Sequence, residues 1–268
     1  MPCVLRPGVA LLRKLRIAVL LYVLAFVAVG TLVESNEATN WDFPLHVVVY
    51  PIAADGTPAV KEHIDTLDSR DFTALASFLA DEASRHSVAL DRPFAFSLAP
   101  ERGMSLPAIA PRPSRVQILL WSLRMRWLSL KLNWRSNLPK PDITVFAVYH
   151  DPDSNLVLDS STALRKGLIA VANLYADSGY RGSNQLVIAH ELLHTLGATD
   201  KYDYGSLQPL YPLGYAEPER NPLHPQRFAE IMAGRRALSA DTAEMPSRLR
   251  DVQIGPVTAI EIGWPDGK

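Results

Sequence analysis

The sequence predicts an α+β fold, in which strands and helices of one domain precede a C-terminal part rich in loops. Short apolar runs with many β-branched residues alternate with stretches whose apolar residues have helical spacing. After residue 200, prolines recur too often for long helices. The chain has 268 residues, which suits one domain of roughly 200–230 residues and a short appendage. We therefore expect residues 1–38 to be the appendage and residues 39–268 to be the domain.

Composition limits the classes of function. The hydrophobic content of 48% is ample for a core. The formal net charge of −1 gives no reason to expect nucleic acid as a partner. Cys3 is the single cysteine, which excludes an intramolecular disulfide framework and any cysteine-rich zinc site.

The N-terminal segment has the charge pattern of a membrane signal-anchor. Basic residues between positions 6 and 16 precede an uncharged run over residues 17–33, and acidic residues follow it. This asymmetry predicts a single-pass membrane protein with a cytoplasmic N-terminus and a catalytic domain outside the cytoplasm, periplasmic in a Gram-negative cell. The alternative is a signal peptide cleaved at Ala28-Val29-Gly30, which would release a secreted protein.

Regular elements are expected in a definite order. The predicted strands are residues 45–52, 94–98, 142–150 and 167–176, and the predicted helices outside the ambiguous stretch are residues 71–86, a helix through His190 and residues 256–264. Residues 100–113 contain four prolines and are expected to form a loop.

Residues 114–135 have a mixed pattern. Up to Trp127 the spacing fits a helix, with one apolar side formed by Val116, Leu119, Leu120, Leu123 and Trp127. From residue 128 to residue 135 apolar and polar residues alternate, which favours a strand. We expect a core helix with a solvated basic edge. Its tryptophans and basic residues would also suit a membrane-surface element.

The motif from His190 to Asp200 is His-Glu-Leu-Leu-His-Thr-Leu-Gly-Ala-Thr-Asp. Residues four apart lie one above the other on a helix, so His190 and His194 can bind one cation. Glu191 lies one step round the helix, where it can take a proton from a metal-bound water. Gly197 ends the helix in the left-handed conformation, and the chain then doubles back to bring Asp200 to the metal. Three protein ligands leave the fourth position of a catalytic zinc for water.

The surroundings of the motif support a zinc-binding helix. Gly-Ser-Asn at 182–184 offers an N-cap. A buried back face is supplied by Leu186, Ala189, Leu192, Leu193 and Leu196. The alternative is a plain core helix, in which two stacked histidines would each need a buried polar partner.

This motif resembles the extended H-E-x-x-H-x-x-G-x-x-(H/D) signature of metzincin-type zinc metallopeptidases, with Asp200 as in the snapalysin-like minority. The resemblance covers about fifty residues, from Ser183 to Gly234. It implies a zincin/metzincin-like fold, with a mixed twisted sheet, an active-site helix and a methionine turn in the C-terminal part. Met232 in Ile231-Met232-Ala233-Gly234 is the best match to that turn, although no tyrosine follows it. In that family an edge strand pairs with extended substrate, and we assign this role to residues 167–176.

The loop after Asp200 offers further candidates. The oxyanion of a reacting carbonyl could be stabilised by any of the following tyrosines: Tyr202, Tyr204, Tyr211 and Tyr215. Asp203 is expected to hydrogen-bond a ligand histidine. His224 is either a reserve metal ligand or a histidine away from the metal.

These features predict a zinc-dependent endopeptidase with Zn²⁺ as cofactor, Glu191 as general base and a peptide or protein as substrate. Two alternatives remain from the sequence. One is a membrane-tethered zinc protein that binds or assembles partners without turnover, and the intact Glu191 speaks against it. The other is a hydrolase of a non-peptide amide. The membrane is expected as a further partner through residues 17–33.

Overall fold

The computed structural model describes residues 14, 16–18, 21–22, 38–100, 104–110, 113–135 and 138–265. Cys3 and most of the run over residues 17–33 lie outside these residues. In the described parts of the chain, no helix has the length and apolar character that crossing a bilayer requires. This finding corrects the predicted single-pass membrane location and the predicted membrane contact. An uncharged run of 17 residues is also short, since a helix needs about 20 residues to span the hydrocarbon core.

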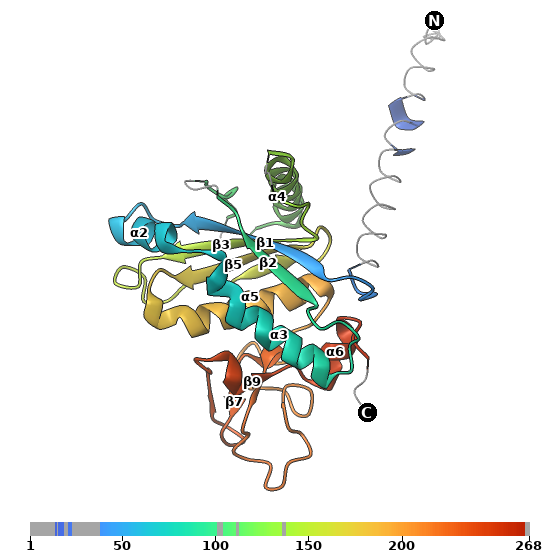
Figure 1. Cartoon of the computed structure of the whole chain (residues 1–268), viewed down its shortest axis with the longest axis vertical. Coiled ribbons are helices and arrows are strands. Elements are labelled where there is room, and N and C mark those ends of the chain that lie inside the picture. Colours follow the sequence, from blue (N-terminus) through green and yellow to red (C-terminus); the bar gives the residue numbers. More distant parts are fainter. Residues whose placement is uncertain are drawn as a thin grey trace, which may run out of the picture.

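A five-stranded sheet forms the centre of the domain, with the order β2-β1-β3-β5-β4 (Figure 1). Its strands are β1 (Leu45–Ala53), β2 (Phe94–Leu98), β3 (Ile143–His150), β4 (Thr162–Leu164) and β5 (Ile169–Tyr175). The first four strands in this order are parallel, and β4 pairs with β5 in the antiparallel direction. The sheet is therefore mixed, and the four predicted strands are confirmed.

Both faces of the sheet are covered, because successive residues of its strands point to opposite sides. On β1, Val47 and Val49 contact the core shared with three helices, namely α2 (Pro58–Thr66), α3 (Thr73–Arg85) and α5 (Arg181–Leu196). Val48 and Tyr50 face the other way and pack under α4 (Arg115–Arg135). Figure 1 shows α4 and α5 on opposite sides of the sheet.

The prediction for residues 114–135 was wrong in two respects. The whole stretch is one helix, α4, and the expected strand after residue 127 does not form. The helix contacts the sheet through Trp121, Met125 and Leu132. The apolar side expected to face the core is instead exposed. The reason is that α4 has apolar residues almost all round, so periodicity alone did not select the buried side.

The predicted edge strand was also assigned wrongly. Strand β5 has neighbours on both sides, whereas β4 is the last strand of the sheet. The sequence of β4 is only Thr-Ala-Leu, which is too short to show an alternating pattern. In the described part of the chain, the sheet edge that contacts α5 therefore belongs to β4.

Two helix starts differ from expectation. Helix α2 was not predicted, although Thr57 caps it and Pro58 occupies its first turn. Helix α5 begins at Arg181, directly after the 3-10 turn Ser178–Tyr180, so Gly-Ser-Asn at 182–184 is already helical. Asn184 does not cap the helix but bonds the backbone of Tyr175 in β5.

The C-terminal part lies under α5, on the side away from the sheet (Figure 1). It contains four two-residue strands, namely β6 (Ala229–Glu230), β7 (Arg236–Ala237), β8 (Ala243–Glu244) and β9 (Val252–Gln253). The predicted last helix is confirmed as α6 (Pro256–Glu261). Helix α5 is thus enclosed between the sheet and the loops that follow it.

Gly197 ends α5 as predicted, with φ of 113°. Its neighbour Ala198 donates its N–H to Leu193, which closes the helix end. A side chain at position 197 would be strained in this backbone conformation, so Gly197→Ala is expected to lower the free energy of unfolding by about 1–3 kcal/mol. Urea denaturation measures this loss.

Gly56→Ala is the matched control, because Gly56 has an ordinary φ and no atom within 4 Å of an added Cβ. Its free energy of unfolding should change by no more than about 0.5–1 kcal/mol. Equal losses in the two variants would contradict the role of the left-handed residue.

Candidate metal centre

Helix α5 is held near its start and along its back face, so its central turns have a fixed position. Near its start, the Asn184 side chain accepts the N–H of Tyr175 at 3.1 Å and donates to the Tyr175 carbonyl at 2.8 Å. Its back face is buried by Ile188, Leu192 and Leu193. The opposite side of the helix carries His190 and His194, whose side chains are 18% and 20% exposed.

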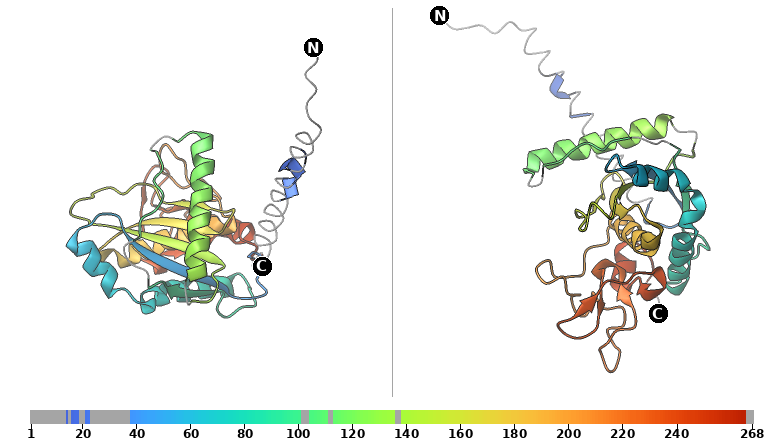
Figure 2. Two further views of the ribbon diagram at one scale, coloured as in Figure 1. Left: turned by 90° about the horizontal axis from the view of Figure 1, so that it is seen from above. Right: turned by 90° about the vertical axis from the view of Figure 1, so that its left-hand side faces the viewer.

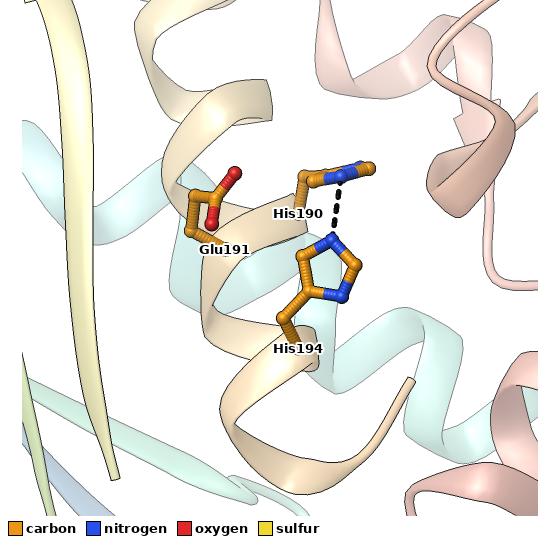
Figure 3. A group of neighbouring side chains, drawn as sticks. All are labelled: His190, Glu191 and His194. Atoms are coloured by element: carbon orange, nitrogen blue, oxygen red, sulfur yellow. Dashed lines mark hydrogen bonds between the residues drawn. The ribbon is translucent and has the colours of Figure 1, made fainter. Parts of the chain in front are cut away.

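Three potential ligand atoms meet beside this side of α5. The Nε2 atoms of His190 and His194 are 3.0 Å apart (Figure 3). The Oδ1 atom of Asp200 lies 3.2 Å from the first nitrogen and 3.1 Å from the second. Ligands about 2.0–2.1 Å from a tetrahedral zinc are about 3.4 Å from one another. The observed spacings are close to that value.

The hydrogen bonds of the other ring nitrogens define the histidine tautomers. The Nδ1 of His190 lies 3.0 Å from the carbonyl of Ile231, and the Nδ1 of His194 lies 2.8 Å from the carbonyl of Ala198. A carbonyl only accepts, so each Nδ1 carries the proton, and each neutral ring presents a lone pair at Nε2. Together with Asp200 Oδ1, three lone pairs converge on one point. Such an arrangement could hold a cation, and the donor set fits Zn²⁺.

Glu191 leaves α5 on a different side from the two histidines (Figure 3). It is 5% exposed, and its Oε2 atom is buried without a hydrogen-bond partner in the structure. Burial raises the pKa of this carboxyl, against the opposing effect of the two histidines. Donor atoms of His190, Glu191 and His194 fall within 4.8 Å of one another, but Asp200 Oδ1 lies nearer to both rings. Asp200 Oδ1 is therefore the third atom of the converging set, and the Glu191 carboxyl lies beside it.

Asp200 is positioned by contacts on both sides of it in the chain. Tyr204 donates its hydroxyl to Asp200 Oδ2 at 2.8 Å. Thr199 donates its N–H and its hydroxyl to Glu261 of α6, at 3.0 and 2.7 Å. Lys201, whose side chain is 3% exposed, pairs with the same carboxylate at 2.7 Å. Burial alone would raise the pKa of Asp200, but the adjoining imidazoles and the hydrogen bond from Tyr204 hold that pKa well below its ordinary value.

The turn that contains Met232 lies against His190. Residues Ile231–Ala233 form a 3-10 turn, and Met232 is completely buried. The turn is fixed by Glu230, a fully buried carboxylate that accepts the N–H of Ala233 at 2.9 Å and the Thr258 hydroxyl at 2.6 Å. The turn lies next to the His190–Ile231 hydrogen bond, and its identity as a methionine turn stays a prediction. Glu230 was missed, because one glutamate in a loop has no distinguishing pattern.

The structure divides the other predicted site residues into two groups. Tyr202 lies near the centre, where burial and the charge of Asp200 raise its pKa to about 12. Asp203 does not contact a histidine, since its Oδ1 accepts from Gly205 and Ser206 in its own turn. His224 is not brought to the metal ligands.

The two remaining tyrosines lie with His224. The hydroxyl of Tyr215 is 3.0 Å from His224 Nε2, and the ring of Tyr211 packs edge-on against the ring of Tyr215. Tyr215 is 7% exposed, and most of Tyr211 is in solvent. This group is therefore a packing cluster in the loop after Asp200, and the structure does not bring it to the converging ligand atoms.

A pocket of about 290 Å³ opens next to the metal centre. His190, Glu191 and Tyr202 form part of its wall. Its apolar lining comes from Leu186, Val187, Ile231, Met245 and Val252. Ser160 and Ser161, which directly precede β4, also line it. The pocket therefore connects the converging ligands, the carboxylate of Glu191 and the edge of the sheet.

No known protein family matches the sequence. No curated protein matches it either. One similar solved structure, titled "Structure of a chaperone-substrate complex", is 15% identical with a TM-score of 0.38. The match covers 84% of this chain, which spans only 32% of that one. A TM-score this low does not establish a shared fold.

Proposed function

We propose that this protein is a zinc-dependent endopeptidase. The observation that carries the proposal is the convergence of His190 Nε2, His194 Nε2 and Asp200 Oδ1 within 3.2 Å of one another. A buried carboxylate without a hydrogen-bond partner, Glu191, lies beside them at the wall of an apolar pocket. A site with only a structural role has no use for that carboxylate.

The residues of the site have separate tasks in hydrolysis. His190, His194 and Asp200 would hold the zinc ion, which supplies Lewis acidity for attack on a carbonyl. Glu191 accepts the proton of the attacking water and later delivers it to the leaving nitrogen. Burial favours this role, because a carboxyl whose pKa is raised is a stronger base than a solvated one. Tyr202, which lines the same pocket, would donate a hydrogen bond to the oxyanion.

The surroundings of the site favour an extended peptide as substrate. The apolar pocket of about 290 Å³ can take a side chain of the substrate. Strand β4 has no strand partner on its outer side in the described part of the chain. Its backbone groups can therefore pair with a peptide backbone by strand addition. This assigns to β4 the substrate-pairing role first predicted for residues 167–176.

The proposal predicts metal-dependent turnover of peptides. The full chain, loaded with one equivalent of zinc, should cleave members of a peptide library at internal bonds. Hydrolysis should stop when a chelator removes the metal and return when zinc is restored. Mass spectrometry of the products measures both the cleavage and its position.

Three results would contradict the proposal. A zinc-loaded chain that cleaves no peptide would overturn the peptidase assignment and favour a zinc protein that only binds its partners. Cleavage that persists after removal of the metal would reject the zinc mechanism. Turnover restricted to non-peptide amides would transfer the same chemistry to another class of substrate.

A further inference from the structure

Helix α4 presents an apolar stripe to solvent on the side that faces away from the sheet. Every residue of this stripe is exposed, from Leu120 at 48% to Trp134 at 84%. We call it the α4 seam, and it consists of Val116, Leu120, Leu123, Trp127, Leu130 and Trp134. The intervals between these residues are 4, 3, 4, 3 and 4, which is the heptad pattern of a coiled-coil seam. A stripe of this size on a protein surface indicates a contact site.

The seam cannot turn inward, because the opposite side of α4 is fixed. Trp121, Met125 and Leu132 pack on the sheet beside Val48, Tyr50 and Phe146. The Trp121 indole also donates to the carbonyl of Pro107 at 2.9 Å, which attaches the helix to the preceding loop. Figure 2 shows α4 as a straight helix along the outside of the domain. The exposed seam is thus a stable feature of the surface.

The charges of α4 define the chemistry of its partner. The helix contains five basic residues and no acidic residue. Arg124 and Lys131 are exposed and directly follow two seam residues, at the flanking positions that choose a coiled-coil partner by charge. A second copy of the chain would bring like charges together along this seam. Charge complementarity therefore favours a partner with acidic residues beside its own apolar stripe.

We propose that the α4 seam is a docking surface for an acidic amphipathic helix of a partner protein. The seam repeats every 3.5 residues over the length of α4, which is about 31 Å for 21 residues. This repeat keeps a second helix in register, whereas a lipid surface requires no such register. Helix α5, which carries His190 and His194, lies on the other side of the sheet (Figure 1), so docking is independent of the proposed peptidase activity.

The test uses a synthetic peptide of three heptads with leucine at positions a and d, glutamate at e and g, and glutamine or alanine elsewhere. Repulsion between the glutamates disfavours pairing of the peptide with itself. Calorimetric titration of the full chain should show one-to-one binding that weakens as salt is added. The double variant L123Q/W127Q should bind at least about tenfold more weakly. The variant L156Q/V157Q is the control, since it changes two apolar residues that are 87% and 88% exposed elsewhere.

Reversing the charges of Arg124 and Lys131 distinguishes specific binding at the α4 seam from non-specific hydrophobic binding. The variant R124E/K131E should lose affinity for the acidic peptide and gain affinity for the same peptide with lysine at e and g. Equal binding of both peptides by the natural chain would overturn the proposal. Self-association in analytical ultracentrifugation that L123Q/W127Q abolishes would also overturn it, because the occupant would then be a second copy. Binding to phosphatidylserine vesicles, without binding to the peptide, would replace the helix with a lipid surface.

Discussion

The Glu191→Gln variant is expected to keep its fold and its zinc, while its rate of peptide hydrolysis falls by about 10²–10⁴-fold. Glutamine is nearly isosteric with glutamate, so the packing of this buried position should hardly change. The side chain does not ligate, so the three converging ligand atoms remain in place. The amide cannot accept a proton at neutral pH, and the loss corresponds to roughly 3–5 kcal/mol of activation free energy.

Three measurements on the same preparation check this result. Peptide turnover gives the rate, metal analysis gives the zinc content, and urea denaturation gives the stability. Glu62→Gln is the matched control, because it makes the same chemical change at an exposed position on α2. Full activity of Glu191→Gln would reject Glu191 as the general base. Loss of zinc from this variant would instead make Glu191 a ligand.

His194→Ala is expected to lose its zinc altogether. The change removes one of the two imidazoles and leaves two protein ligands for the metal. Asp200→Asn should behave differently, because the amide oxygen keeps the position of a ligand without its charge. Its affinity for zinc should fall, and its activity should return in part when excess zinc is added. Metal analysis after dialysis, together with turnover at increasing zinc concentration, measures both effects.

His224→Ala is the control for the loss of a histidine. His224 lies against Tyr215, so its removal should leave one full equivalent of zinc bound. A full equivalent of zinc in His194→Ala would disprove the proposed ligand set. Loss of zinc from His224→Ala would show that His224 replaces or joins Asp200 at the metal.

Local sequence patterns were sufficient to predict part of the fold. The strands β1, β3 and β5 are continuous apolar runs, as expected for strands covered on both faces. Gly197 marked the end of α5, because few other residues adopt its backbone conformation without strain. Short or ambiguous elements were missed. Strand β4 has three residues, and its place at the edge depends on pairing with β5, which the sequence of β4 does not specify.

In the candidate site, too, local sequence patterns predicted only part of the arrangement. The spacing of His190 and His194 on one helix side follows from helix geometry, so the sequence was informative there. The carbonyls of Ile231 and Ala198, which select the histidine tautomers, are backbone groups with no sequence signal. Asp203 was misassigned, since an aspartate in a loop bonds nearby N–H groups more readily than a distant histidine.

The hydrogen bonds between Thr199 and Glu261 make the position of Asp200 depend on a part of the chain that is synthesised later. His190 and His194 lie on one side of α5, and the Ile231 carbonyl that holds His190 follows 41 residues after it. Thr199, which directly precedes Asp200, is bonded to a carboxylate 62 residues further on, Glu261 of α6. During synthesis, a growing chain can therefore present two ligands but not the fixed third one. If the proposed ligand set is right, full-strength zinc binding would require α6 to have docked first.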